Sequence, residues 1–396
     1  MQYLFIETDD QLASFCQQLA SESYCAVDTE FVREKTYYPL LSLIQISGEQ
    51  HMACIDPFAI TDFEPLRQLF QKPELLKVFH SPSQDLEILY QHFGEVPTPV
   101  FDTQLAAAVL GYQHQISYAD LVFEVTGTRL EKKYTRADWS KRPLSKDEID
   151  YAMDDVRYLM PVYRQIKQDL EAKNRTSWIE KDLDTMSLSS TYEVDVSSQW
   201  HRLKGIQKLK GVQLQIARKL CEWRELRAQQ KNRPRRWIVA DDWIIEIARK
   251  KPTKLEDLAL IRDIPAKVAE HQGPALIDIV NQSLQSSASE WPETLKPQQL
   301  SLHQQALGDC LMGLCRIIAD DNNIALATFA TRKDIDNLIT NRKSSRLAQG
   351  WRFSMAGEQL LSFIYGQSTL AVDDGRICLS GKSGATEPES SKIAAH

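Results

Sequence analysis

Short apolar runs that alternate with marked helix starts constrain the fold of residues 1–172 more than any other feature. Apolar runs predict strands at 24–27, 41–46, 52–55, 76–79 and 100–101, and the first three follow closely, as in a meander. Four pairs with capping-box spacing predict helix starts: Thr8 with Gln11, Thr61 with Glu64, Ser81 with Gln84, and Ser145 with Glu148. This alternation is typical of a layered α/β domain.

The rest of the chain has a helical pattern. One long helix is predicted from Ser145 to about Lys173, and further helices at 212–230, 241–249, 255–260 and 265–283. We therefore divide the chain into segments: an α/β domain at 1–172, a polar linker at 173–204, a helical domain at 205–287, a second helical domain at 298–372 that is suspected to be a repeat, and a disordered tail at 381–396.

Composition excludes several classes of protein. A chain of 396 residues, 43% hydrophobic and 26% charged, is too long for one core and predicts two or three globular domains. No apolar run reaches the ~18 residues of a membrane span, and the N-terminus does not have the order of a signal peptide, so a cytoplasmic protein without a membrane partner is expected. Seven cysteines without a CxxC pair predict reduced thiols and argue against a zinc module.

Two acids follow a strand-like run in "VDTEF". Asp28 and Glu30 are two residues apart, so on a strand both side chains lie on one face, although a polar face of an edge strand is an equal alternative for an isolated pair. Asp85 is expected in the first turns of a helix that follows a strand, where an acid is also common for helix-dipole reasons. Tyr151 and Asp155 are four residues apart on one helix face, and spacing alone does not exclude Asp154 or a solvated acidic face.

Taken together, these acids predict a metal site. If Asp28, Glu30, Asp85 and Asp155 converge, their like charges repel unless cations neutralise them. Hard oxygen ligands suit Mg²⁺ or Mn²⁺ and not zinc. Two such ions can assist an in-line phosphoryl displacement, and the hydroxyl of Tyr151 could orient the attacking water.

The segments that carry these residues resemble a known family. "VDTEF" with "REKTYYPLLSLIQIS", then "VFHSPSQDLEIL", "FDTQLAA", "DWSKRPL" and "YAMDDVRYL", are similar to ribonuclease D, a bacterial family of four-carboxylate 3′-to-5′ exonucleases with the tyrosine form of the third motif. The resemblance covers about residues 1–172. It implies a ribonuclease-H-like mixed sheet, two divalent ions, and release of 5′-mononucleotides from RNA, notably transfer RNA precursors. Carried over, it assigns Asp28, Glu30, Asp85, Tyr151 and Asp155 as catalytic, the four acids as metal ligands, and leaves Asp154 out.

Other chemistries have no support in the sequence. His51, His80 and His92 lie near the acids in the chain, but no HExxH or Cys/His spacing accompanies them, so core or surface roles are predicted. The sequence contains no GxSxG, Walker or GxGxxG motif.

A basic segment with aromatic residues precedes the helix of Tyr151. Its cations and rings suit single-stranded RNA, because cations neutralise phosphates and rings stack on bases, although a solvated loop is an alternative. The RNA-binding residues predicted here are Lys132, Lys133, Arg136 and Arg142. Tyr134 and Trp139 lie among them, and we predict a core role for Trp139.

A second basic region lies at 201–251. It has fifteen positive and five negative residues, a net charge of +10 in a chain of net charge −7, which is typical of a nucleic-acid footprint but also fits a charged helix surface. This block resembles the helicase-and-ribonuclease-D C-terminal (HRDC) domain. We predict RNA binding by Lys208, Lys210, Arg233, Arg235 and Arg236. Core positions are predicted for Trp237, Ile238, Trp243 and Ile244, and an architectural role for the diverged second copy at 298–372.

The hypothesis from the sequence is a metal-dependent exoribonuclease whose α/β domain cuts RNA and whose helical half binds it. A monomer is the favoured state. Two rivals remain: an exonuclease directed at DNA, because nothing in the acids reads a 2′-hydroxyl, and a non-catalytic RNA-binding adaptor.

Overall fold

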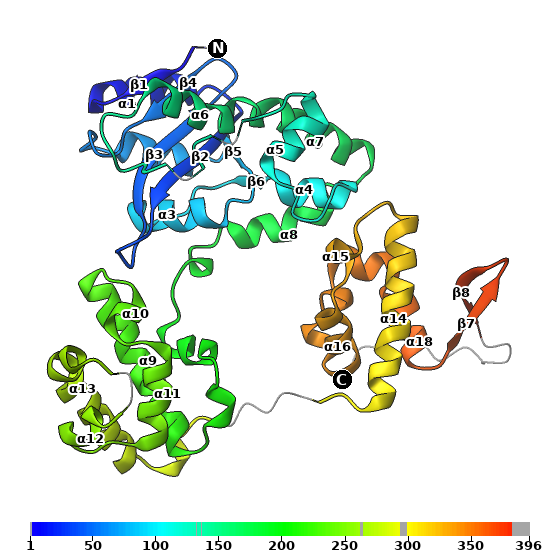
Figure 1. Ribbon diagram of the computed structural model, residues 1–396. Helices are drawn as coiled ribbons and strands as arrows, with labels where there is room; N and C mark the ends of the chain where they lie inside the picture. The colour runs from blue at the N-terminus through cyan, green and yellow to red at the C-terminus, as the bar shows by residue number, and fades with distance from the viewer. Residues whose placement is uncertain (1, 132, 136, 262–263, 294–298, 382–396) are drawn as a thin grey trace.

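The computed structural model describes residues 2–131, 133–135, 137–261, 264–293 and 299–381. Its first part is built on a six-stranded mixed sheet of order β1-β4-β3-β2-β5-β6 (Figure 1). The strands are β1 Leu4–Ile6, β2 Tyr24–Val32, β3 Leu40–Ser47, β4 Met52–Ile55, β5 Leu76–Phe79 and β6 Val100–Asp102. Strands β2, β3 and β4 form the predicted antiparallel meander, and the other pairs are parallel. Every predicted strand is present in this sheet, whose short β1 was missed.

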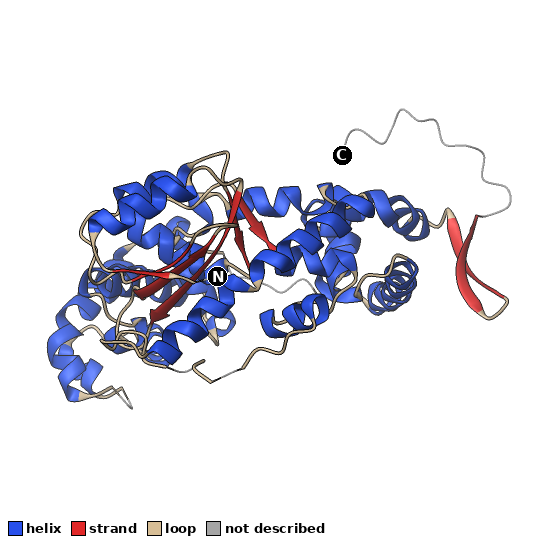
Figure 2. Ribbon diagram, turned by 90° about the horizontal axis from the view of Figure 1, so that it is seen from above, coloured by secondary structure: helices blue, strands red, loops and turns tan. Residues whose placement is uncertain are grey.

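Helices cover both faces of this sheet (Figure 2). One face packs against α1 Asp9–Leu19, α2 Glu64–Gln71 and α3 Ser83–Phe93. The other packs against α4 Thr103–Leu110, α5 Tyr118–Thr126, α6 Lys146–Arg157 and α7 Leu159–Ala172. Because side chains alternate along β2, Val27 enters the first core and Ala26 the second. Asp28 and Glu30 have the parity of Ala26 and therefore face α6.

Two of the four predicted helix caps are confirmed. Thr8 caps α1, and Ser145 forms a complete capping box with Glu148 at the start of α6. The prediction for Thr61 was wrong, because α2 begins only at Glu64 and the Thr61 hydroxyl donates to Asp9 instead. Ser81 is not a cap either: its φ is +58°, its amide donates to an acceptor on β6, and α3 starts at residue 83.

The long helix predicted from Ser145 to Lys173 is two helices. Helix α6 ends and α7 begins at Tyr158, which is the C-cap of one and the N-cap of the other. Pro161 explains the break, since proline has no N–H to donate to the carbonyl of Arg157 one turn earlier and is tolerated only in a first turn. The break places Asp155 in the last turn of α6.

The remainder of the described chain is mainly helical. In the segment predicted as a linker lies α8 Ser177–Met186, whose Ile179 is buried in the α/β core. The first helical block contains α9 Val212–Lys231, α10 Arg235–Ile238, α11 Asp241–Lys250, α12 Leu255–Ala259 and α13 Ala266–Gln285. The second contains α14 Leu302–Asp321, α15 Leu326–Phe329, α16 Arg332–Thr340 and α18 Glu358–Ile364. Both blocks start with a helix of 20 residues followed by one of 4, the order expected of a diverged repeat.

The end of the second block departs from the helical prediction. Strands β7 Ser368–Asp373 and β8 Arg376–Gly381 form an antiparallel hairpin that projects from the second helical block in Figure 2 and contacts α14 and α18. Asp374 and Gly375 connect the strands with φ of +45° and +75°, the conformation that an Asp-Gly pair favours in a two-residue turn. The dipeptide was a signal in the sequence that the prediction missed. From residue 382 onward the predicted tail lies outside the described residues.

Each helical block contacts the α/β part. Tyr37, in the β2–β3 connection, donates its hydroxyl to Glu225 of α9, and its backbone amide donates to the side chain of Asn232 at 3.0 Å. At the second block Trp178 of α8 stacks on Trp351 with ring centroids 4.5 Å apart. Within the described ranges no helix has the length and apolarity needed to cross a membrane.

Candidate active site

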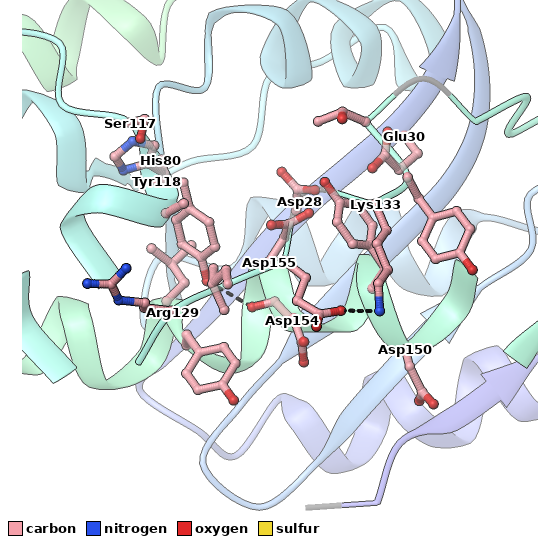
Figure 3. A pocket seen from close by; sticks show the side chains of 18 of the residues that line it. Asp28, Glu30, His80, Ser117, Tyr118, Arg129, Lys133, Asp150, Asp154 and Asp155 are labelled. Carbon is pink, nitrogen blue, oxygen red and sulfur yellow. Dashed lines mark hydrogen bonds and ion pairs between the residues drawn. The ribbon is translucent and has the colours of Figure 1, made fainter. Parts of the chain in front are cut away.

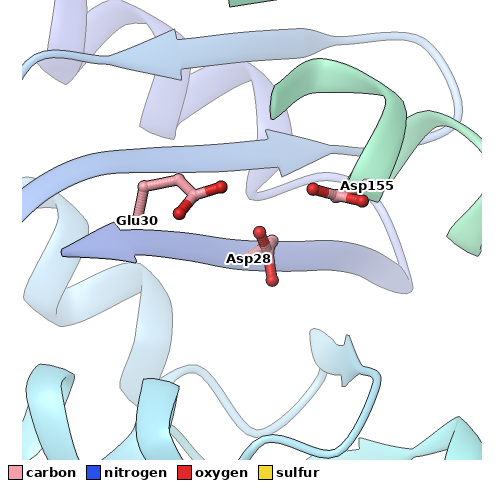
Figure 4. A group of neighbouring side chains, drawn as sticks. All are labelled: Asp28, Glu30 and Asp155. Carbon is pink, nitrogen blue, oxygen red and sulfur yellow. The ribbon is translucent and has the colours of Figure 1, made fainter. Parts of the chain in front are cut away.

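Three of the predicted acids meet on the sheet face that α6 covers. Asp28 and Glu30 lie two residues apart on β2, so both side chains leave the same face of the strand. Asp155 is on α6, which packs against β2 and β3. One carboxylate oxygen from each of the three lies within 4.8 Å of the others (Figure 4). The fold therefore brings acids from distant segments to one point.

Asp85, the fourth predicted acid, lies beside this group and not in it. It occupies the first turn of α3, directly after β5. Thr29 Oγ1 donates to Asp85 Oδ1 at 2.6 Å, and Thr29 leaves β2 on the face opposite to Asp28. Burial and then the charge of Asp85 are the main causes that raise the pKa of Asp28, so the fourth carboxylate is close enough to interact with the group.

The electrostatics of the group favour protonation in the absence of a cation. Burial, followed by the charges of Asp155 and Asp85, raises the pKa of Glu30 to about 8. Burial, followed by the charges of Asp154 and Asp85, raises the pKa of Asp155 to about 7. In the part of the chain that the structure describes, no Lys or Arg forms an ion pair with these carboxylates.

These observations fit a hard divalent cation. Half-buried carboxylates without a basic partner repel one another, and a bound cation removes that cost. The three clustered ligand candidates are all carboxylates, with no histidine or cysteine in their group. All-oxygen donors suit Mg²⁺ or Mn²⁺, whereas zinc prefers nitrogen and sulfur.

Tyr151 lies one turn before Asp155 on α6, inside an aromatic cluster. Its ring contacts Tyr134 with centroids 5.7 Å apart and stacks on Trp139 at 6.4 Å. Trp139 is only 4% exposed, which confirms the predicted core role. Burial and then the charge of Asp155 raise the pKa of Tyr151 to about 12, so its hydroxyl stays protonated at neutral pH and can donate a hydrogen bond.

A cavity of about 910 Å³ opens in front of the acids (Figure 3). Among its lining residues are Asp28, Glu30, Tyr151 and Asp155, together with His80 and with several that the sequence did not indicate: Ser117, Tyr118, Arg129, Asp147, Asp150 and Tyr158. The hydroxyl of Tyr118 donates to the backbone carbonyl of Asp154 at 2.9 Å, which ties α5 to α6. The ring nitrogens of His80 lie 3.0 Å from Thr103 Oγ1 and 3.1 Å from the carbonyl of Ile116, so His80 has the structural role that the sequence predicted.

Asp154 differs from its neighbour Asp155. Its carboxylate pairs with Arg157 on the same helix, and it lies outside the group of three clustered acids although it lines the cavity. The omission of Asp154 from the metal-ligand set stays a prediction.

The basic segment before α6 is only partly available to RNA. Lys133 lines the cavity and is paired with Glu131 at 2.5 Å, while Lys132 and Arg136 lie outside the described residues. The prediction for Arg142 is contradicted, because its guanidinium donates to both carboxylate oxygens of Asp56 and to three backbone carbonyls. Arg142 therefore fastens this segment to the sheet and has no N–H free for a phosphate.

The basic residues of the first helical block separate into different environments. Arg235 pairs with buried Glu225 and lies 4.7 Å over the ring of Tyr37, at the contact between the two domains, so its role as an RNA ligand stays a prediction. The side chains of Lys208, Lys210, Arg233 and Arg236 are exposed. Ile238 and Ile244 are buried as predicted, but Trp237 is 57% exposed, because α10 ends after one turn and turns this ring away from the core.

The first part of the chain has a mixed sheet with clustered carboxylates and a neighbouring tyrosine, and a small helical module follows it. This combination defines a 3′-to-5′ exonuclease with an HRDC domain. Residues 3–171 match the 3′-5′ exonuclease family and residues 213–280 match the HRDC domain. The chain is 35% identical to ribonuclease D of Nitrobacter hamburgensis over 94% of this chain and 98% of that one, and 36% identical to ribonuclease D of Acidiphilium cryptum over 94% and 96%. The crystal structure of Escherichia coli RNase D, described as an exoribonuclease involved in structured RNA processing, superposes with a TM-score of 0.84 at 29% identity, covering 92% of this chain and 99% of that one.

The chain belongs to the ribonuclease D family. It is a hydrolytic 3′-to-5′ exoribonuclease, its macromolecular partner is RNA, and its cofactor is a divalent metal ion.

Proposed function

We propose that this exoribonuclease trims the 3′ ends of transfer RNA precursors and acts as a monomer in the cytoplasm. The observation that carries the proposal is the acid group at the base of a cavity of about 910 Å³, in a chain that also has a basic helical module. A cavity of this size accommodates terminal nucleotides of an RNA strand but not a duplex. The helical module supplies a surface for the folded body of the substrate.

Asp28, Glu30, Asp85 and Asp155 would hold two divalent ions in this proposal. When bound, such ions polarise the phosphoryl group and lower the pKa of a coordinated water. The protonated Tyr151 hydroxyl orients the attacking water, and its ring is kept in place by Tyr134 and Trp139. The aromatic rings of the cavity stack on the terminal bases without sequence preference.

The test uses a transfer RNA precursor with a short 3′ extension. Purified protein with Mg²⁺ should shorten it one nucleotide at a time to 5′-mononucleotides, and EDTA should stop the reaction. An equal rate on a matched DNA oligonucleotide, or no release from RNA with Mg²⁺ or Mn²⁺, would contradict the proposal. Sedimentation of the active fraction measures the proposed monomeric state.

Tyr151→Phe is expected to lower kcat by ~100-fold, the lower end of the range for a lost catalytic group, because the phenylalanine ring still packs beside Tyr134 and Trp139 while the hydroxyl is gone. Metal affinity, measured by calorimetry, should stay within twofold of the parent. A matching loss of metal affinity would show that the residue acts through the ions and not through the water.

Lys208→Gln combined with Lys210→Gln is expected to weaken RNA binding without changing turnover at saturating RNA. Both side chains are exposed in the segment that directly precedes α9. Losing two phosphate contacts should reduce the slope of log K against log salt by ~1.4 for single-stranded RNA. Lys333→Gln with Lys343→Gln is the matched control in the second helical block, whose predicted role is architectural. Equal effects of both pairs would mean that charge alone, and not the α9 surface, controls binding.

A further inference from the structure

The sheet face below the acids carries a buried polar side chain that the chemistry above does not use. Gln45, near the middle of β3, has an exposed fraction of 0%. Neither Oε1 nor Nε2 of its amide has a hydrogen-bond partner, and within the described ranges it is the one side chain with two such atoms. Buried polar groups without partners are rare because each costs free energy comparable to a lost hydrogen bond. Gln45 therefore requires an explanation.

The position of Gln45 relates it directly to the acid group. In the antiparallel β2–β3 pair its register partner is Asp28. Side chains of such partners leave the same face, with Cβ atoms ~4.5–5.5 Å apart. The neighbours of Gln45 also indicate that its side chain faces α6. Leu43 and Ala26, which have the same parity, belong to the core below α6, whereas Ile44 and Ile46 belong to the opposite core.

The other neighbours on this face are weak hydrogen-bond partners for the Gln45 amide or are apolar. On the far side of Gln45 its register partner is Cys54, a buried thiol and a weak hydrogen-bonding group. Leu43 on the same strand and Ala152 and Val156 of α6 are apolar members of the core that covers this face. Asp28 is thus the strong acceptor directly beside the amide.

We propose that Gln45 is a positioning residue for the cation site, whose Nε2 donates a hydrogen bond to the Asp28 carboxylate when that carboxylate holds an ion. The inference rests on the metal-ligand role proposed for Asp28. A ligating carboxylate is commonly fixed by an outer hydrogen bond to an oxygen that is not engaged with the metal. A neutral amide suits this position, because a lysine would compete with the cation for Asp28 and a glutamate would add to the repulsion of the group.

Gln45→Met tests this role, since methionine has a similar length without polar atoms. Removing an orphaned amide should leave the unfolding temperature of the metal-free protein unchanged or higher. Mg²⁺ and Mn²⁺ affinity, measured by calorimetry on the metal-free protein, should fall ~10-fold or more, the usual effect of removing an outer partner of a metal ligand. The kcat should fall at saturating RNA while KM for RNA changes little.

Gln215→Met is the matched control. Gln215 lies on α9 in the first helical block, is buried, and has an Oε1 without a partner. Its replacement makes the same chemical change far from the acids, so it should leave metal affinity and kcat unaltered. Gln45→Leu provides a second apolar variant in case methionine packs poorly.

The outcomes separate this inference from the proposed function. Unchanged metal affinity and kcat in both Gln45 variants would overturn it, as would a metal-free protein that is destabilised with normal metal affinity, which indicates a structural amide only. Asp28→Asn examines the function itself: if this variant still binds Mg²⁺ normally, the proposed cation site fails. If Asp28→Asn abolishes binding and the Gln45 variants do not alter it, only the positioning role is rejected.

Discussion

Asp155→Asn is expected to lower Mg²⁺-dependent nucleotide release by ~1000-fold or more, because a divalent ion contributes several kcal/mol of transition-state stabilisation and about 1.4 kcal/mol corresponds to tenfold in rate. An amide cannot replace the charge of a carboxylate that clusters with those of Asp28 and Glu30, the ligands proposed for the ion. The folded state should be retained or become more stable without metal, because one like charge leaves a crowded group. Single-turnover release from a 5′-labelled RNA, together with thermal unfolding, measures both effects.

Asp154→Asn is the matched control for this experiment. It makes the same change at the adjacent residue, whose carboxylate pairs with Arg157 and lies outside the clustered acids. We expect its activity to stay within ~5-fold of the parent, since about 1 kcal/mol corresponds to that factor. Equal losses in the two variants would mean that total negative charge, and not the ligand geometry, controls activity. Full activity of Asp155→Asn would reject the assignment of the site.

Mg²⁺ is expected to raise the unfolding temperature strongly at pH 8 and weakly near pH 5. In the metal-free fold the pKa of Asp28 is raised, that of Glu30 is raised to about 8 and that of Asp155 to about 7. Burial is the largest cause of each shift, and the charges of neighbouring acids add to it. At these three acids the folded chain therefore binds more protons than the unfolded chain, so their contribution to the stability of the metal-free protein is most favourable below the unfolded pKa of ~4 and is lost as pH rises through the raised values. A cation replaces those protons, so its effect grows with pH.

The expected rise in unfolding temperature on Mg²⁺ binding follows from mass action. At an ion concentration ~100 times the dissociation constant, binding adds ~2.7 kcal/mol, or ~5–10 °C for a domain of this size. Differential scanning calorimetry with Mg²⁺ or EDTA at both pH values measures it, with KCl at equal ionic strength as the control for screening. Asp28→Asn should reduce the difference between the two pH values. An equal shift at both would show that the ions bind elsewhere.

Much of the α/β fold could be predicted because its signals are local. Apolar runs located the strands, and the Ser145–Glu148 capping box located the start of α6, which sets Tyr151 and Asp155 on one helix face. The alternation along β2 put Asp28 and Glu30 on a common face. Where local signals competed, prediction failed: Pro161 divided the long helix, and the Asp374-Gly375 turn produced a hairpin where helix was expected.

The sequence by itself determined which elements form and which acids share a face, because the strand and helix periods depend only on neighbouring residues. The tertiary structure alone decided which charged side chains are free. Arg142 is bound by Asp56 and by backbone carbonyls and has no N–H left for RNA, Arg235 pairs with Glu225, and Trp237 is exposed. It also decided that Asp85 bonds to Thr29 and that Gln45 is buried beside Asp28 without a partner. The reason is physical: the partner of a polar side chain depends on which distant segment packs against it, and no local period in the sequence records that contact.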